Sequence, residues 1–376
     1  MKGYINMIFT VDKDEFEKAI IPVSIVAQNK SSEASLSGVY MEAKDNKLVL
    51  YCYDIERGIR TEIDADVKKE GCIIADYQIV PIIHSLNGGE VYIEVDDNYI
   101  INIKNDESEL QIMGRDGSSY PKIPEVRGFS SFTISRRQLK NVISKTMFAV
   151  SDDESKPILK GSLFEISDGK LTVSAIDGFR FTVRTEKSTV DKSDLNVSFI
   201  LPGKAEQNLL RIIDDSDDNI SCELANKHII FVMDNLYILI RLLEGDFPSY
   251  QKFIPQYDVK AVVDKQELIA SLERVNIINA KKKTSAKLTF VNDQLKIFCK
   301  TDLGQVSDVI SVYMEGDPIE ANFNQSYLLD ALRACDDEKV VLRVAGQGRG
   351  LVIVAREEDE KDDSSYLQLV MPVRAR

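Results

Sequence analysis

The sequence predicts an α+β protein built from three tandem copies of one domain, each with two helices on antiparallel sheets. Two phrases recur in the same order. One is a short strand running into a helix start, at Phe9–Phe16, Phe132–Leu139 and Ala261–Leu268. The other is an apolar strand ending in aspartate, at Leu48–Asp54, Leu171–Asp177 and Leu295–Asp302. The first phrase is offset by 123 residues (9 to 132) and 129 residues (132 to 261), too long for the roughly 20–50 residues of a solenoid unit.

The length of 376 residues also favours several domains, because a single core stops growing well below that size. Turn-rich segments at Pro121–Gly128 and Ile254–Tyr257 provide the boundaries. We therefore expect domains over residues 1–128, 129–256 and 257–376.

Each copy is expected to run strand, helix, two strands, helix and three strands, and a full unit is expected to hold eight or so strands. The first copy places helices near Asp12–Ile21 and Asp76–Leu86, and Pro22 is expected to end or kink the first of them. The third copy places helices near Lys265–Ile278 and Gln325–Cys335.

In the middle copy, a strand at Phe132–Ile134 precedes an apolar stripe at helical spacing, and a second helix covers Lys204–Ile213. Alternating or apolar runs predict strands at Gly161–Ile166, Lys170–Ala175, Arg180–Thr185, Ile220–Leu224, His228–Met233 and Tyr237–Leu242.

Composition excludes several classes of protein. A net charge of −14 argues against a protein that grips nucleic acid by bulk electrostatics. No apolar run approaches the ~20 residues that a bilayer demands, so the cytoplasm is the default location. The five cysteines are never spaced C-x-x-C, and His84 and His228 are the only histidines. We therefore expect no metal, no cofactor and no catalytic site.

Several longer segments resemble one family, the bacterial DNA polymerase III β subunit, or β sliding clamp. They are Ala175–Val183, Leu201–Lys204, Leu243–Pro255, Phe323–Asp330 and Leu369–Arg374. The resemblance covers the chain from Met7 onward. It implies three DNA-clamp domains that assemble into a closed, head-to-tail homodimeric ring around duplex DNA, without sequence preference and without catalytic activity.

The resemblance also implies partners that dock in one peptide groove per subunit: the DNA polymerase III catalytic subunit, the clamp loader and other proteins with a clamp-binding motif. An extended peptide would insert a leucine and an aromatic side chain there. The groove residues implied are Leu159, Ile176, Gly178, Phe179, Arg180, Phe181, Pro248, Phe253, Asn324, Tyr327, Leu369, Val370, Met371, Pro372, Val373 and Arg374.

Taken alone, the Asp177-Gly178 motif is better explained as a tight turn with Phe179 and Phe181 in a core. The apolar carboxyl terminus favours the groove, since termini are normally polar unless docked. The departures from the family pattern are Lys283 for an aromatic, Gly348 and Gly350 for larger residues, Phe179 for a commoner histidine, and an additional Arg376.

Basic residues gather on one predicted helix: residues 135–148 carry four basic and no acidic residues. The candidate DNA-facing residues are Arg136, Arg137, Lys140 and Lys145 there, with Lys30, Lys156 and Lys204 from the resemblance. A solvated helix face would look the same. The acidic first helix favours an alternative, a clamp-like scaffold that does not encircle DNA. Leu110, Ile277 and Ile278 match the family's subunit contact, although each could equally be core.

Overall fold

The computed structural model describes residues 6–27, 37–192, 194–279, 285–346, 350–354 and 365–374. The chain divides into two compact units. One comprises Met1–Arg137 with Gln207–Leu242, and the other comprises Gln138–Glu206 with Leu243–Arg376. The middle copy therefore contributes strands to both units.

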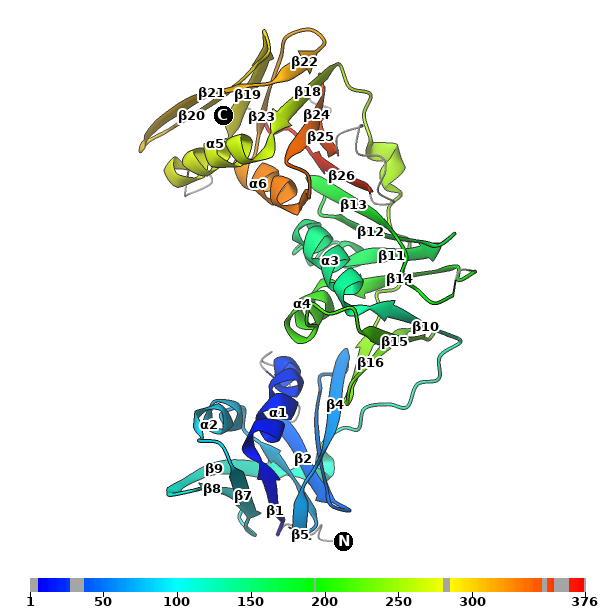
Figure 1. Ribbon diagram of the computed structural model, residues 1–376, viewed down its shortest axis with the longest axis vertical. Coiled ribbons are helices and arrows are strands. Elements are labelled where there is room, and N and C mark those ends of the chain that lie inside the picture. Colours follow the sequence, from blue (N-terminus) through cyan, green and yellow to red (C-terminus); the bar gives the residue numbers. More distant parts are fainter. Residues whose placement is uncertain are drawn as a thin grey trace. The chain divides into compact units, whose positions relative to one another are not determined.

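The first unit is built on a 13-stranded antiparallel sheet, in the order β10-β15-β16-β17-β4-β3-β2-β6-β9-β8-β7-β1-β5. Its helices α1 (Lys13–Ala27) and α2 (Ile79–Ser85) contact each other and lie on the same side of the first copy's strands (Figure 1). The strands are β1 (Ile8–Asp12), β2 (Val39–Lys44), β3 (Lys47–Tyr53), β4 (Arg57–Asp64), β5 (Asp66–Lys69), β6 (Gly71–Ala75), β7 (Glu90–Val95), β8 (Ile100–Asn105), β9 (Ser108–Asp116), β10 (Ser130–Ser135), β15 (Asn219–Leu224), β16 (His228–Met233) and β17 (Leu236–Arg241).

Helix α1 continues past the point where the sequence predicted its end. Pro22 lies inside the helix, which runs on to Ala27. Val23 and Val26 beyond the proline are buried, and the Ser24 hydroxyl donates a hydrogen bond to the Ile21 carbonyl. Packing of this last apolar turn outweighs the one backbone hydrogen bond that proline removes.

The second unit contains a nine-stranded antiparallel sheet, β14-β11-β12-β13-β26-β25-β24-β18-β22, and a four-stranded one, β21-β20-β19-β23. Its strands are β11 (Gly161–Ser167), β12 (Lys170–Ile176), β13 (Arg180–Lys187), β14 (Val197–Pro202), β18 (Val259–Asp264), β19 (Ala286–Val291), β20 (Gln294–Thr301), β21 (Gly304–Ser311), β22 (Tyr313–Glu315), β23 (Ile319–Phe323), β24 (Lys339–Ala345), β25 (Gly350–Val354) and β26 (Ser365–Val370).

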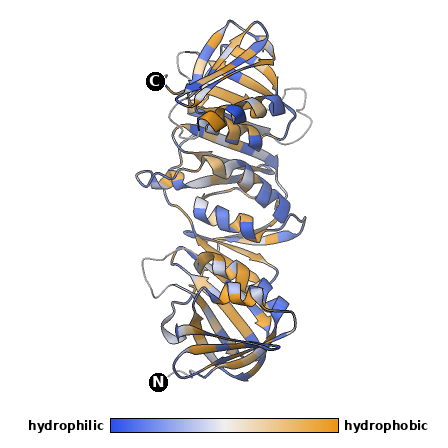
Figure 2. Cartoon of the chain, turned by 90° about the vertical axis from the view of Figure 1, so that its left-hand side faces the viewer, coloured by the Kyte–Doolittle hydropathy of each residue, from blue (hydrophilic) through white to orange (hydrophobic). Residues whose placement is uncertain are grey.

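Four helices complete the fold: α3 (Arg136–Thr146), α4 (Gly203–Ile212), α5 (Lys265–Ile278) and α6 (Gln325–Ala334). Helices α5 and α6 cover a core in which Leu272, Val275 and Leu332 meet Val259, Ala261 and Phe290 from the sheets. On α3, Leu139, Val142 and Ile143 are buried while Arg137 and Ser144 are exposed. In Figure 2 the helices in the middle of the chain are mostly hydrophilic, those toward either end are mixed, and the strands are largely hydrophobic.

All six predicted helices are present, but the predicted strand order was wrong. Four or five strands separate the helices of each copy, more than the two of the general order or the three predicted for the middle copy. The missed strands include the short β5 and β22 at sheet edges and β14. Their residues are mostly exposed or mixed, so no alternating pattern marked β5 or β22.

Across the described ranges, no helix is both long and apolar enough to cross a membrane. Within those same ranges, no group of three or more histidine, cysteine, aspartate or glutamate side chains could hold a metal ion.

Glu206 is an unusual buried acid in the first part of α4. Its side chain is fully buried, and Oε1 accepts a hydrogen bond of 3.1 Å from the Ser162 backbone N–H. Oε2 has no hydrogen-bond partner among the described residues. Burial raises the pKa of Glu206 to about 8, and the bond from Ser162 offsets only part of this. The carboxyl is therefore protonated at neutral pH.

Glu206→Gln is predicted to stabilise the protein at high pH. Between the ordinary carboxyl pKa of 4.5 and about 8, the unfolded chain releases this proton and the folded chain keeps it, so wild-type stability falls as pH rises. Glutamine keeps an acceptor and cannot ionise. The rise in pKa from 4.5 to about 8 corresponds to about 5 kcal/mol, and 1 kcal/mol shifts Tm by about 2–4 °C at this domain size. We therefore expect a gain of about 10 °C at about pH 9 and little at about pH 5. The exposed Glu315→Gln is the control, and a gain independent of pH would contradict the prediction.

Candidate partner-binding groove

The candidate groove begins with the pairing of two strands that lie far apart in the sequence. Strand β13 pairs with β26 from Arg180↔Val370 to Thr185↔Ser365. Residues directly opposite on neighbouring strands face the same side of a sheet. Ile176, Phe181, Leu369 and Val352 are opposite one another in turn across β12, β13, β26 and β25. They form one apolar row that joins the middle copy to the third.

This row is the floor of the groove. Ile176, Phe181 and Leu369 are buried, as are Leu159, Val183 and Val352 beside them. Partly buried apolar residues pack against this cluster: Ile158, Phe247, Tyr250, Val354, Leu367 and Met371. The Tyr250 ring lies 6.1 Å from the Phe181 ring. The predicted Pro248 therefore belongs to a segment whose neighbours Phe247 and Tyr250 contact the floor.

A tight turn shapes one rim of the groove. Gly178 has φ +97°, a conformation that favours glycine. Asp177 Oδ1 accepts hydrogen bonds from the backbone N–H groups of Phe179 and Arg180, at 2.8 and 2.9 Å. The turn thus holds Phe179 outward, with 59% of its surface exposed.

Arg180 links this turn to the rest of the middle copy and to the third copy. Its Nε donates to Asp177 at 2.9 Å, Nη1 to Asp330 on α6 at 2.7 Å, and Nη2 to the Phe148 carbonyl at 2.6 Å. Its guanidinium also lies 4.2 Å from the centroid of the Tyr327 ring, a cation–π contact. Burial raises the pKa of Tyr327, so this ring stays neutral. Arg180 thereby fixes the aromatic wall of the groove.

The carboxyl-terminal segment forms another wall. The Met371 N–H donates to the Phe179 carbonyl and the Val373 N–H to the Asn322 carbonyl, both at 2.8 Å. Asn324 caps α6 by accepting from the Ser326 N–H. Met371, Pro372 and Val373 are half-buried and Arg374 is exposed. The two backbone hydrogen bonds and the half-burial of Met371, Pro372 and Val373 hold this segment against the protein.

Two predicted groove residues lie differently from the rest. Val370 is completely buried in the core beneath α5 and α6, because alternation along β26 turns it away from Leu369. Phe253 is 50% exposed and is not part of the buried cluster. Gly350 has φ +117°, and a Cβ there would lie 3.7 Å from Met371 Sδ. Lys283, Gly348 and Arg376 fall outside the described residues.

Sequence reasoning missed Asp330, which orients Arg180, and Val352 and Leu367, which extend the floor. Val352 and Leu367 reach the floor through the pairing of β25 with β26 and of β26 with β13, and a single sequence does not reveal which distant strands pair. Tyr250 could have been found, since it stands two residues after Pro248 within the segment that suggested the groove.

The candidate DNA-facing residues are mostly engaged by carboxylates. Arg136 is only 7% exposed and bonds Asp234 at 2.7 Å and Asp214 at 3.3 Å. The exposed Arg137 pairs with Asp215 and Asp217. A buried guanidinium held by two carboxylates is costly to free, whereas an exposed pair is worth about 0–1 kcal/mol and exchanges readily. Arg136 thus has the geometry of a structural ion pair.

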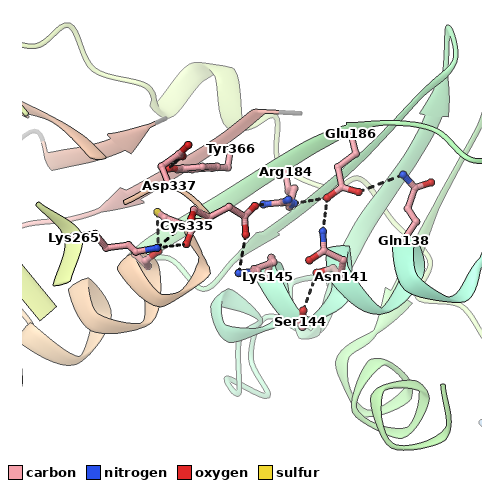
Figure 3. A network of polar contacts seen from close by, with 12 residues as sticks. Gln138, Asn141, Ser144, Lys145, Arg184, Glu186, Lys265, Cys335, Asp337 and Tyr366 are labelled. Atoms are coloured by element: carbon pink, nitrogen blue, oxygen red, sulfur yellow. Dashed lines mark hydrogen bonds and ion pairs between the residues drawn. The ribbon is translucent and has the colours of Figure 1, made fainter. Parts of the chain in front are cut away.

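Among the lysines, Lys145 donates to a polar network between α3 and the third copy. It lies 3.0 Å from Asp336, which also binds Arg184 at 2.6 Å. Arg184 in turn bonds Glu186, which accepts from Asn141 and Gln138 on α3 (Figure 3). Burial alone would raise the pKa of Asp336, but Lys145 and Arg184 lower it on balance.

The remaining lysines differ in exposure and partners. Lys156 is 3.7 Å from Asp153, and its Nζ lies 3.2 Å from where a Cβ of Gly178 would be. Lys140 is half-buried and Lys204 is exposed. Lys30 lies outside the described residues.

The candidate subunit-contact residues lie on or near sheet edges. Leu110 is half-buried on β9, whose residues 108–113 pair with β8 alone among the described strands. Ile277 at the end of α5 is 74% exposed. Ile278 instead packs partly buried against the third copy's core.

Comparison with known proteins accounts for nearly the whole chain. Sequence models of the DNA polymerase III β subunit match its N-terminal domain to residues 7–124, its central domain to 133–249 and its C-terminal domain to 251–374. A β sliding clamp from Staphylococcus epidermidis is 28% identical over 98% of this chain and 99% of its own length.

Solved structures give the same result. A DNA polymerase III β subunit of Eubacterium rectale aligns with TM-score 0.90 and 27% identity, over 98% of this chain and all of that one. A sliding clamp from Bartonella birtlesii, solved bound to griselimycin, aligns with TM-score 0.88 and 25% identity over the same shares. The chain therefore belongs to the DNA polymerase III β-subunit family, the DNA sliding clamps, which are non-catalytic processivity factors.

Proposed function

We propose that this clamp works as a cytoplasmic, head-to-tail homodimeric ring that surrounds duplex DNA. It tethers the DNA polymerase III catalytic subunit and other proteins with a clamp-binding motif, after a clamp loader has placed it on DNA. The observation that carries the proposal is the apolar groove completed by the carboxyl-terminal segment, in a chain whose whole length matches sliding clamps. The domain limits near residues 128 and 256 belong to the same proposal.

The groove suits a short, exchangeable ligand. A buried leucine or aromatic anchor contributes about 1.5–3 kcal/mol. Two such anchors, less the cost of ordering the peptide, give roughly micromolar affinity. The Asp177 carboxylate holds the turn and backbone hydrogen bonds hold the terminal wall, so little further ordering is needed on binding. Partners can then take turns on one groove.

DNA would be retained by topology more than by charge. Of the candidate cations, Arg137, Lys140 and Lys204 are the most suitable for transient phosphate contacts, since the first two are only partly covered and Lys204 is exposed. Arg136 and Lys145 support the fold through Asp234 and Asp336. Weak contacts of this kind leave a ring free to slide.

The subunit contact is proposed between two sheet edges. Residues 108–113 of β9 have one edge with no partner among the described strands, and Met113 on this strand is 63% exposed. Strand β21 is the edge of the four-stranded sheet, with Val309 58% exposed and Ile277 on the neighbouring helix. Exposed edges with apolar side chains readily pair with another chain.

Removal of residues 372–376 is predicted to weaken binding of a polymerase-derived clamp-binding peptide by at least tenfold, roughly one lost anchor contact. The shorter deletion of Ala375 and Arg376 is the matched control, because it leaves the wall intact. Fluorescence anisotropy with labelled peptide measures both. Equal affinity for the two truncated proteins would sink the groove assignment.

Ile277→Arg and Met113→Arg are each predicted to convert a dimer into a monomer, because either places a charge in the apolar contact. Light scattering at micromolar concentration should change from twice the 42.3 kDa chain mass to the chain mass itself. Ile55→Arg, at another exposed isoleucine, should leave the dimer unchanged. A dimer that survives both substitutions would place the contact elsewhere.

Wild-type protein loaded on nicked circular DNA is predicted to remain bound during gel filtration and to be lost after the DNA is linearised. Retention on the circle should depend little on salt, since a ring holds DNA without net phosphate neutralisation. Equal retention on both forms would indicate ordinary phosphate binding and favour the scaffold alternative.

A further inference from the structure

A cavity of about 500 Å³ lies next to the groove in the second unit. One side is the connecting segment Ile254–Tyr257, and the other is formed by Arg343, Val352 and Leu367 from β24, β25 and β26. No residue of the predicted groove lines it. Ile254 and Tyr257 are 39% and 46% exposed, an unusual amount of apolar surface for one short segment.

The cavity is continuous with the groove. Val352 and Leu367 belong to the same apolar cluster as Ile176, Phe181 and Leu369. Val352 lies opposite Leu369 on one side and opposite Arg343 on the other. The apolar row of the groove floor therefore ends at Val352 on β25, and the guanidinium of Arg343 follows on the next strand, β24.

The lining has a definite chemistry. The Arg343 guanidinium lies 5.0 Å from the centroid of the Tyr257 ring. Lys260 is the next residue opposite Arg343, with Glu315 beyond it on β22. The cavity lining thus offers the apolar side chains of Val352 and Leu367 and, at its far end, one guanidinium, that of Arg343. An apolar side chain followed by a carboxylate fits this order.

We propose that the cavity is an extension of the partner groove and receives the residues that flank a clamp-binding motif. The flank carries one apolar side chain, seated against Val352 and Leu367, and one acidic side chain, paired with Arg343. Neighbouring strands are about 4.8 Å apart, so the two steps from Leu369 to Arg343 span about 10 Å, or three residues of extended peptide. This proposal rests on the proposed function of the groove.

The test uses three labelled peptides in fluorescence anisotropy: a core clamp-binding peptide, and the same peptide extended by four residues containing leucine and glutamate at either its amino or its carboxyl end. Matched extensions with serine and glutamine serve as peptide controls. The protein variants are Arg343→Gln and Tyr257→Ala, with Arg333→Gln, an exposed arginine on α6, as the control.

One extended peptide should bind the wild-type protein about fivefold to tenfold tighter than the core peptide, the gain expected of one partly buried anchor and one exposed ion pair. That gain should fall below about twofold in Arg343→Gln and Tyr257→Ala and persist in Arg333→Gln, while all four proteins bind the core peptide equally.

No gain from either extension, or a gain that survives both cavity substitutions, would overturn the extension while leaving the groove in place. Failure of the core peptide to bind the wild-type protein would overturn the groove and the extension together.

Discussion

The hydrogen-bonded pairing of β13 with β26 is the interaction on which the groove depends. It brings the first half of the middle copy and the last strand of the third copy into one sheet. Phe181 and Leu369 become neighbours only through this register, and the same register puts Val370 into the opposite core. A slip of one residue would reverse both faces and abolish floor and core together.

Side-chain contacts reinforce that pairing at two places. Arg180 joins its own turn to Asp330 and Tyr327 of α6. Arg184 and Lys145 share Asp336 just after the same helix. Each contact satisfies a partly buried charge with an opposite one, the arrangement that makes burial of ions tolerable. The groove walls are therefore set before any ligand arrives, which lowers the entropic cost of binding.

The helices and the repeat could be predicted from the sequence, because amphipathic periodicity over ten or more residues is a strong local signal. It failed where tertiary packing decided the outcome. Buried residues beyond Pro22 extended α1, and edge strands such as β5 and β22 lacked a pattern. Arg136 looked like a solvated cation but is buried between Asp214 and Asp234, acids roughly 80 and 100 residues later in the chain. Most groove residues came from the resemblance, whereas Val352 and Leu367 required the strand register.

The sheets that run through the copy boundaries also bear on mechanics. Strand β4 of the first copy pairs with β17 of the middle one, just as β13 pairs with β26. Separating either pair of strands would break all of their backbone hydrogen bonds at once and expose two unpaired strand edges. The subunit contact proposed at β9 and β21 would have no covalent chain across it and could form again after it opens. In a ring of such chains, that contact would deform more easily than the two strand-paired copy boundaries.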